Sequence, residues 1–115
     1  MLNGTKEPGL LMGDLNASNN SKVADILGKK LTDTIKDAKM KHKGPIGIFN
    51  NFLNNQKIIK RIDYVFSKGF QTISHEHMDI KLESGNHISD HLPVFVKVKI
   101  PNWFMPEEFF MRNYV

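Results

Sequence analysis

The sequence predicts a small α/β (α+β) domain in which one mostly antiparallel mixed sheet is covered by a helix. Apolar residues recur at spacings of three to four between positions 21 and 39, which is typical of an amphipathic helix. Segments 58–66, 70–80 and 94–100 alternate apolar or β-branched with polar residues, which predicts strands, the first two being neighbours in the sheet. The 115 residues suffice for one hydrophobic core and exclude a second domain.

The domain is expected to begin with a short strand. Residues 10–12 form an apolar run that Gly13 closes, which suits a strand buried on both faces and ending at a turn. Residues 1–9 contain Gly and Pro but no apolar period. We therefore expect a flexible lead-in there, followed by the domain at residues 10–115.

Three local features complete the expected chain. Gly28 lies inside the helical pattern and predicts a break or bend. After the Gly44-Pro45 turn, residues 46–49 predict a short strand. The aromatic-rich tail from Trp103 to Val115 is expected to pack over an apolar surface.

Composition narrows the classes of function. Sixteen Lys and Arg against 12 Asp and Glu give a net charge of +4, which favours contact with polyanions without requiring it. The absence of cysteine excludes disulfides, thiolate zinc sites and cysteine nucleophiles. No apolar run approaches the roughly 20 residues of a membrane span, and the first residues lack a signal-peptide pattern. The localisation stays open.

Two segments place a carboxylate beside a predicted strand. Asp14 and Asn16 follow the end of the first strand, where both side chains can reach one point, although such a pair, taken alone, is more often an Asx turn or a helix cap. Asp63 lies within an otherwise apolar strand, where an ionised carboxylate needs a partner. Arg61 or a histidine is the expected partner.

A third segment, Ser89-Asp90-His91, forms a turn before the last strand. In a turn, a hard oxygen ligand and an imidazole can both reach one site. Taken alone, the pair is more often a solvated aspartate and a surface histidine.

The order and wording of these segments carry a resemblance. Gly13-Asp14-Leu15-Asn16, Arg61-Ile62-Asp63-Tyr64 and Ser89-Asp90-His91 resemble the three C-terminal signature segments of the endonuclease/exonuclease/phosphatase family. Three ordered motifs are more specific than any one of them, and the match spans roughly residues 10 to 100. The resemblance implies about half of a four-layer α/β/β/α sandwich and metal-dependent phosphodiesterase or nuclease chemistry.

The resemblance implies a role for five residues. Asp14 would orient or deprotonate the attacking water, and Asn16 would hydrogen-bond the phosphate. Asp90 would ligate Mg²⁺ or Mn²⁺, hard cations that prefer oxygen. His91 would contact the scissile phosphate, and Asp63 would hold its imidazole in the useful tautomer and favour its charged form.

Asn50 follows Phe49 where relatives carry a loop at the substrate, so the resemblance places it in the substrate pocket. The other histidines are interpreted as structural. His75 and His77 share one face of a predicted strand, but no third ligand is near in sequence, so an exposed face is favoured over a metal pair. His42 and His87 are expected at the surface.

The family domain is about twice this length, and its first half supplies an early Asn and the Glu that is its principal metal ligand. Neither can be located here, because Glu7, the acid that precedes Asp14, lacks the family's sequence context. The chain would then supply one helix-covered sheet with a bare apolar inner face. Such a face predicts self-association or pairing with the missing N-terminal half.

The resulting hypotheses are three. The first is a phosphoesterase acting on a phosphate ester, with DNA, RNA, a lipid head group and an inositol phosphate all open, and the basic balance mildly favouring nucleic acid. The second is a non-catalytic fragment or interaction module that keeps the sheet. The third, a small basic nucleic-acid-binding domain, is disfavoured because no stacking-aromatic motif or basic recognition helix is present.

Overall fold

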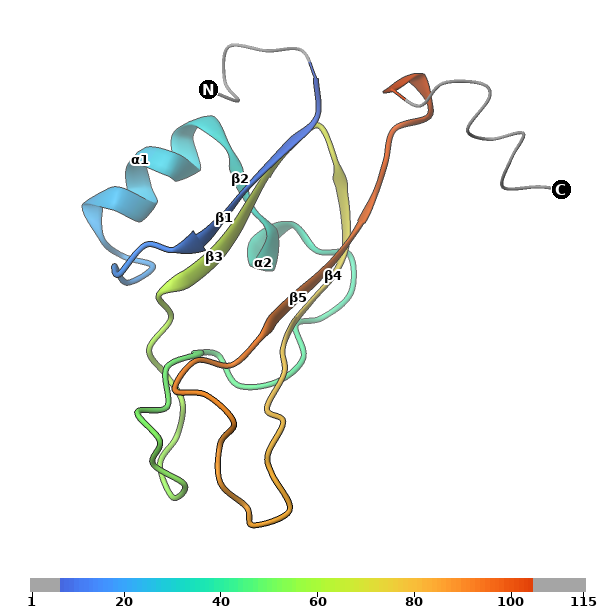
Figure 1. The fold of residues 1–115 in the computed structure, drawn as a ribbon. Coiled ribbons are helices and arrows are strands. Elements are labelled where there is room, and N and C mark those ends of the chain that lie inside the picture. The colour runs from blue at the N-terminus through green and yellow to red at the C-terminus, as the bar shows by residue number, and fades with distance from the viewer. Residues whose placement is uncertain (1–6, 105–115) are drawn as a thin grey trace, which may run out of the picture.

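A computed structural model describes residues 7–104 of the chain (Figure 1). The elements in chain order are β1 (Gly9–Asp14), α1 (Lys22–Lys30), β2 (Thr32–Asp33), α2 (Thr34–Asp37), β3 (Asp63–Lys68), β4 (Gln71–His77), β5 (Val94–Lys99) and a 3-10 turn (Asn102–Phe104). The predicted flexible lead-in at 1–9 and the predicted packed tail fall largely on residues 1–6 and 105–115, which lie outside the described residues.

The strands of the described chain form two small antiparallel sheets, β1-β3-β2 and β4-β5. The predicted α+β class is confirmed, and the strands are divided between two sheets. The prediction that segments 58–66 and 70–80 are neighbours is wrong, because β3 already pairs with β1 on one edge and β2 on the other. With both edges occupied, β4 pairs with β5 instead.

The register between β1 and β3 runs from Gly9 opposite Lys68 to Asp14 opposite Asp63. It therefore brings the carboxylates of two predicted site residues side by side at one end of the sheet. β1 is not buried on both faces as predicted, because Met12 is 61% exposed. Leu11, on the other face, packs against the core beneath α1.

The helix predicted at 21–39 is shorter than expected. Ser21 caps α1 by accepting a hydrogen bond from the Ala24 amide at 3.2 Å, as an N-cap serine should. The helix ends at Lys30, with Leu31 as its C-cap, two residues beyond the predicted break at Gly28.

Tertiary contacts explain the break. The buried Asp33 carboxylate accepts two hydrogen bonds from Arg61, each 2.6 Å long. The Thr34 hydroxyl donates to the Val65 carbonyl at 2.8 Å. Thr32 and Asp33 pair with β3 as the two-residue strand β2, so these tertiary contacts override the local helical pattern until the chain turns helical again at α2.

Two apolar clusters form the core. One consists of Leu31, Tyr64 and Phe66, lies between α1 and the first sheet, and is joined by Leu11, Leu15 and Leu27. The other lies beneath the segment that precedes β5 and consists of Ile48, Ile58, Ile62 and Leu92, with Phe49 and Val94 against it. The second cluster supports the loops that carry the predicted site.

The segment between α2 and β3 is irregular. The strand predicted at 46–49 is not formed; Phe49 instead makes single bridges to Lys60 and His91. The strand predicted at 58–66 begins only at Asp63, whereas the one predicted at 94–100 is confirmed as β5. Among the described residues, no helix is long and apolar enough to cross a membrane.

Candidate functional site

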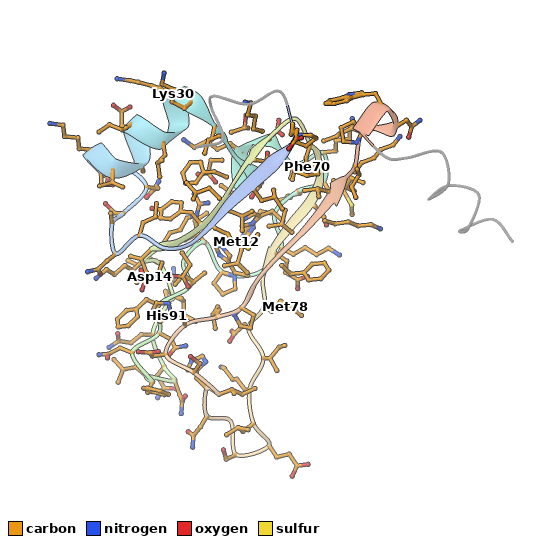
Figure 2. The ribbon with its side chains drawn as sticks, turned by 45° about the horizontal axis from the view of Figure 1, so that its top comes forward. Met12, Asp14, Lys30, Phe70, Met78 and His91 are labelled. Atoms are coloured by element: carbon orange, nitrogen blue, oxygen red, sulfur yellow. The ribbon has the colours of Figure 1, made fainter. Side chains whose placement is uncertain are left out.

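Asp14, Asp63 and His91 converge although they are far apart in sequence. Asp14 ends β1, Asp63 begins β3 directly opposite, and His91 precedes β5. One side-chain oxygen or nitrogen from each lies within 4.8 Å of the others. Figure 2 shows Asp14 and His91 close together, far from Lys30 at the end of α1. The structure thus brings three of the predicted residues into one group.

The centre of this group is a hydrogen bond from His91 Nδ1 to the Asp63 carboxylate at 2.8 Å. This bond is the main cause that raises the pKa of His91; burial, the next largest effect, lowers it, and the charges of Asp63, Asp90 and Asp14 raise it further. Opposed carboxylates on paired strands repel each other, so a charged imidazole beside them offsets that cost. With Nδ1 occupied, Nε2 is the nitrogen available to a substrate.

Asp14 and Asn16 form a tight turn after β1. The Asn16 amide donates to Asp14 Oδ1 at 2.7 Å, and Asn16 adopts a φ of 49°, which asparagine tolerates better than most residues. The Leu15 amide donates to the Ile62 carbonyl at 2.9 Å and anchors the turn to the segment before β3. The Asx turn foreseen as the structural alternative is thus present, and Asp14 and Asn16 are both exposed.

Asn50 is 6% exposed and supports the turn that carries Asp90 and His91. Its side-chain amide donates to the Ser89 carbonyl at 2.9 Å, and its backbone amide donates to the Asp90 carbonyl at 2.9 Å. Its side-chain oxygen accepts from the Phe52 amide at 2.7 Å. These bonds make Asn50 a positioning residue, and its contact with substrate stays a prediction.

Arg61 is not the partner of Asp63; of the two partners expected from sequence, the histidine is the one found. Arg61 turns to Asp33 and lies over the Tyr64 ring at 4.4 Å from its centroid. The Tyr64 hydroxyl in turn contacts the Ala17 carbonyl at 2.8 Å, which ties the loop after β1 to β3. Arg61 is therefore a structural residue.

The oxygen atoms near His91 fit a hard divalent cation. Asp63 Oδ1 is buried without a hydrogen-bond partner in the described structure, and Asp14 contributes a second carboxylate to the same group. Oxygen donors of this kind suit Mg²⁺. Asp90, the predicted ligand, acts on the charge of His91 but is outside the close group of three found among residues 7–104.

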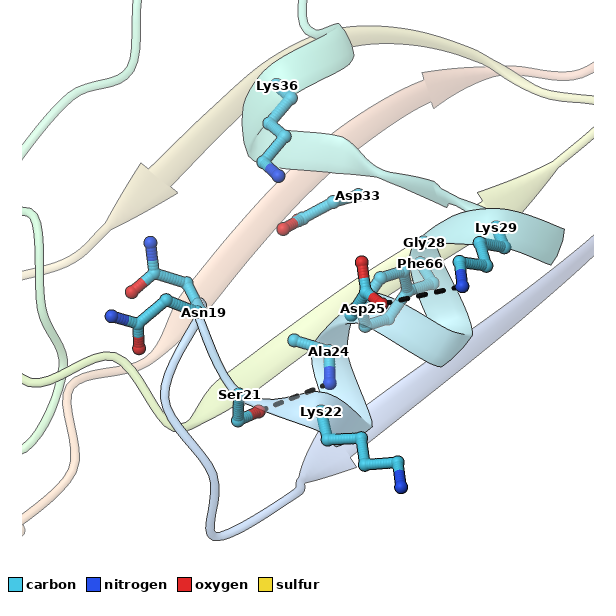
Figure 3. A pocket seen from close by; sticks show the side chains of 11 residues that line it. Asn19, Ser21, Lys22, Ala24, Asp25, Gly28, Lys29, Asp33, Lys36 and Phe66 are labelled. Atoms are coloured by element: carbon cyan, nitrogen blue, oxygen red, sulfur yellow. Dashed lines mark hydrogen bonds and ion pairs between the residues drawn. The ribbon is translucent and has the colours of Figure 1, made fainter.

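A groove of about 460 Å³ opens beside the group. Its lining combines Asp14, Asp63 and His91 with the apolar side chains of Met12 and Val94. A second cavity of about 500 Å³ lies between α1 and α2 and includes Asp25, Asp33 and Lys36 in its wall (Figure 3). It contains none of the predicted site residues, so the groove at His91 is the candidate active site.

Sequence reasoning missed a group of histidines. His75 and His77 are 1% and 0% exposed, so the predicted exposed strand face is wrong. The third member is His42, more than 30 residues upstream, and one ring nitrogen from each lies within 4.8 Å of the others. The two-residue spacing of His75 and His77 is the signal that the sequence offers, and the third ligand is not near them in sequence. His87, also expected at the surface, is buried near Asp79.

No protein-family model matches the sequence, and no curated protein matches it. Solved structures do. A conserved protein of unknown function from Enterococcus faecalis V583 is 33% identical with a TM-score of 0.76, covering 82% of this chain and 37% of its own. An endonuclease/exonuclease/phosphatase family protein from Bacteroides thetaiotaomicron is 26% identical with a TM-score of 0.71, covering 83% and 37%.

A third structure, a mannosyl-6-phosphatase from Bacteroides thetaiotaomicron VPI-5482, is 25% identical with a TM-score of 0.72 and covers 84% of this chain and 39% of its own. The chain thus spans about 37–40% of the length of the structures it matches. The chain is thus an α+β protein whose clustered carboxylates and histidine, Asp14, Asp63 and His91, lie at or next to the ends of strands. Its fold is that of a C-terminal part of the endonuclease/exonuclease/phosphatase family proteins that it matches.

Proposed function

We propose that the chain carries part of the active site of a metal-dependent phosphoester hydrolase. The observation that supports this most directly is the 2.8 Å bond from His91 Nδ1 to Asp63, with Asp14 in the same close group. A carboxylate that holds one ring nitrogen fixes the tautomer and directs the other nitrogen outward. The arrangement suits a phosphate oxygen better than it suits an apolar ligand.

His91 and Asp63 act as one unit in this proposal. The raised pKa of His91, caused chiefly by its hydrogen bond to Asp63, keeps the imidazole charged over more of the neutral range. A charged Nε2–H then donates to a phosphoryl oxygen, and charge-assisted hydrogen bonds of this kind are about twice as strong as neutral ones. The chain's net charge of +4 favours the approach of an anionic ester.

In this proposal, Asp14 acts on the attacking water and Asn16 on the phosphate. Asp14 Oδ1 holds the turn by accepting from the Asn16 amide, and the carboxylate accepts a proton from water. The Asn16 side-chain amide donates to the phosphate as its charge develops. Asp90 would hold Mg²⁺ or Mn²⁺ with carboxylate oxygen, and the cation supplies charge neutralisation at the phosphoryl oxygens.

The substrate class we favour is a phosphate monoester or diester with an organic group small enough for the groove. One similar structure is a mannosyl-6-phosphatase, which supports a sugar phosphate. The basic balance supports nucleic acid as the alternative. Release of phosphate from mannose 6-phosphate and cleavage of single-stranded DNA, both with Mg²⁺, distinguish the two.

Hydrolysis of a generic nitrophenyl phosphate ester tests the site. With Mg²⁺, we expect Asp14→Ala, Asp90→Ala and His91→Gln each to lower turnover by about 100-fold or more, the usual effect of losing a general acid or base. Asp25→Ala, a change in an exposed carboxylate on α1, serves as the matched control and should leave the rate unchanged. Turnover that survives both aspartate changes would refute the assigned roles.

A second measurement does not depend on turnover. The pKa of His91 can be followed by NMR through its ring protons, with and without inorganic phosphate. Asp63→Asn should lower that pKa because it removes the carboxylate that raises it, and it should weaken phosphate binding at pH 7. If the pKa of His91 did not move, Asp63 would not be the residue that keeps the imidazole charged.

We further propose that the apolar face beside the site pairs with the polypeptide that the longer solved structures contain and this chain does not cover. Met12, at 61% exposed, and Phe95, at 53%, lie on strands of the two sheets. Mixing the chain with that region of a similar protein should give a 1:1 complex by light scattering and raise the rate of hydrolysis above that of the chain alone. A homodimer would favour self-association, and a complex without hydrolysis would favour an interaction module.

A further inference from the structure

The three histidines His42, His75 and His77 form a second polar group within the described chain. His75 and His77 are two residues apart on β4, so they lie on the same face of that strand. His42 lies in the segment after α2 and covers them. The three ring centroids are 4.5 to 5.0 Å apart, and His42 Nδ1 is 3.0 Å from His75 Nδ1.

One carbonyl sets the tautomers of two of these rings. The Pro45 carbonyl accepts from His42 Nε2 at 2.9 Å and from His77 Nδ1 at 2.8 Å. Since a carbonyl can only accept, both nitrogens carry hydrogens, and the lone pairs are left on His42 Nδ1 and His77 Nε2. Histidines that bind metals usually donate their second nitrogen to a carbonyl or carboxylate in this manner.

Two nitrogens of the group are buried without a partner. His75 Nε2 and His77 Nε2 make no hydrogen bond, although both side chains are essentially inaccessible to solvent. A buried nitrogen without a partner costs stability and calls for a specific explanation. Burial also lowers the pKa of His75 to about 3 and that of His77 to about 4, so both rings are neutral at pH 7, the form that binds metals.

The backbone holds the covering segment tightly against β4. Lys43 bridges to Glu76, with its amide donating to the His75 carbonyl at 3.2 Å and its carbonyl accepting from the His77 amide at 3.0 Å. Gly44 has a φ of 89°, and a Cβ there would lie 2.0 Å from the His77 carbonyl oxygen. Only glycine allows this approach, so the position of His42 is built into the backbone.

We propose that His42, His75 and His77 form a binding site for a divalent transition metal of the zinc class. Imidazole ligands suit such metals, and three histidines leave one coordination position for water, as in other three-histidine zinc sites. Zn–N bonds of about 2.0–2.1 Å place tetrahedral ligand atoms roughly 3.3 Å apart. The nitrogens, which now lie within 4.8 Å of one another, reach that spacing with side-chain shifts of roughly 1 Å.

The site is chemically distinct from the oxygen-rich group at His91. Mg²⁺ prefers oxygen donors and has little affinity for a pocket of neutral imidazoles. The bound metal would fix the segment that runs from His42 to Asn50, whose amide supports the Ser89-Asp90 turn. Its role is therefore to hold the loops beneath the candidate active site.

Titration of the metal-free chain with Zn²⁺, followed by calorimetry, and with Co²⁺, followed by visible absorption, tests the proposal. One equivalent of Zn²⁺ should bind, excess Mg²⁺ should not displace it, and Co²⁺ should give the absorption of a tetrahedral site. His42→Gln should weaken Zn²⁺ binding by about 100-fold or more, because it removes a direct ligand rather than an outer partner. His42 is only half-buried, so this variant is the one best suited to fold; its fold is checked by circular dichroism.

Two controls make the result decisive. His91→Gln should keep the full zinc affinity, and so should His87→Gln, which changes a buried histidine outside the group. Loss of zinc binding in His91→Gln but not in His42→Gln would place the metal at the other group and overturn the proposal. Equal affinity in all variants, or no binding by the unmodified chain, would overturn it too.

Discussion

The two histidine groups of this chain lie in opposite electrostatic surroundings. His91 is partly exposed, and its bond to the Asp63 carboxylate raises its pKa. His75 and His77 are buried beside other bases, and their pKa values fall to about 3 and 4, chiefly through burial. One residue type thus serves as a cation in one place and as a neutral donor-acceptor in the other. A carboxylate partner favours the charged form of the imidazole, and burial favours the neutral form.

The two groups should therefore respond to different ions. The charged imidazole of His91 and its neighbouring oxygens suit a phosphate together with a hard cation. The neutral rings of the buried group suit a softer metal. Three perturbations test this contrast, beginning with the one that should have the largest effect.

Arg61→Met should lower the free energy of unfolding by about 3–5 kcal/mol, because it leaves the Asp33 carboxylate buried without its partner. Arg61 also helps to lower the pKa values of His75 and His77, so both should rise if the fold survives. Urea unfolding and NMR titration measure the two effects. Lys29→Met, which breaks the exposed pair with Asp25, is the control and should cost about 0.5 kcal/mol or less. An equal cost for both would show that the Arg61 pair is effectively solvated.

Acid should destabilise the metal-free chain through the buried group. In the unfolded chain His75 and His77 take up protons as the pH falls through about 6.5, whereas in the folded chain their pKa values are about 3 and 4. Stability is thus retained above pH 6.5 and lost between about pH 6.5 and 4, by about 1.4 kcal/mol per pH unit for each histidine. Urea unfolding as a function of pH, with a chelator present, measures this slope.

His75→Phe should reduce that slope by about half, since one titrating group is removed. His91 has the opposite sign. Its raised folded-state pKa gives stability that is present below about pH 6.5 and is lost as the pH rises through the raised value. His91→Gln should therefore leave the loss of stability between pH 6.5 and 4 in place, and an equal reduction of the slope in both variants would contradict the contrast.

The smallest effect is expected from changing Asn50, which supports the turn that carries His91. Asn50→Ala removes the side-chain bonds to the Ser89 carbonyl and the Phe52 amide, and should lower stability by about 1 kcal/mol. In NMR spectra, the ring chemical shifts of His91 should change more than those of His75. Asn54→Ala removes an exposed bond to Asn86 and serves as the control. Equal perturbation of both histidine groups would mean that Asn50 supports the whole fold.

Local patterns were enough to predict much of the fold. The alternation at 94–100 predicted β5, and the apolar spacing from residue 21 onward predicted the start of α1. The helix end and the division into two sheets were not predictable, because they depend on the Asp33–Arg61 ion pair and on both edges of β3 being occupied. Neither is visible in a local window of sequence.

The site shows the same limit. The turn residues Asp14 and His91 were found because a resemblance supplied their order, and the structure brings them together with Asp63. The group of His42, His75 and His77 was missed because its members are joined by a fold contact between residues more than 30 positions apart. Burial, which turns a histidine from a surface residue into a candidate ligand, depends on packing that the sequence pattern alone does not show.

Asp14 lies directly opposite Asp63 in the β1–β3 register. This pairing limits where the chain can gain or lose a residue. A strand displaced by one residue turns every side chain to the other face. An insertion of one residue within β1 would therefore direct Asp14 away from His91, even if the sheet formed with normal stability. The exposed loop at 18–20 lies beyond that register, so it is the place where the length of this region can vary without disturbing the pair.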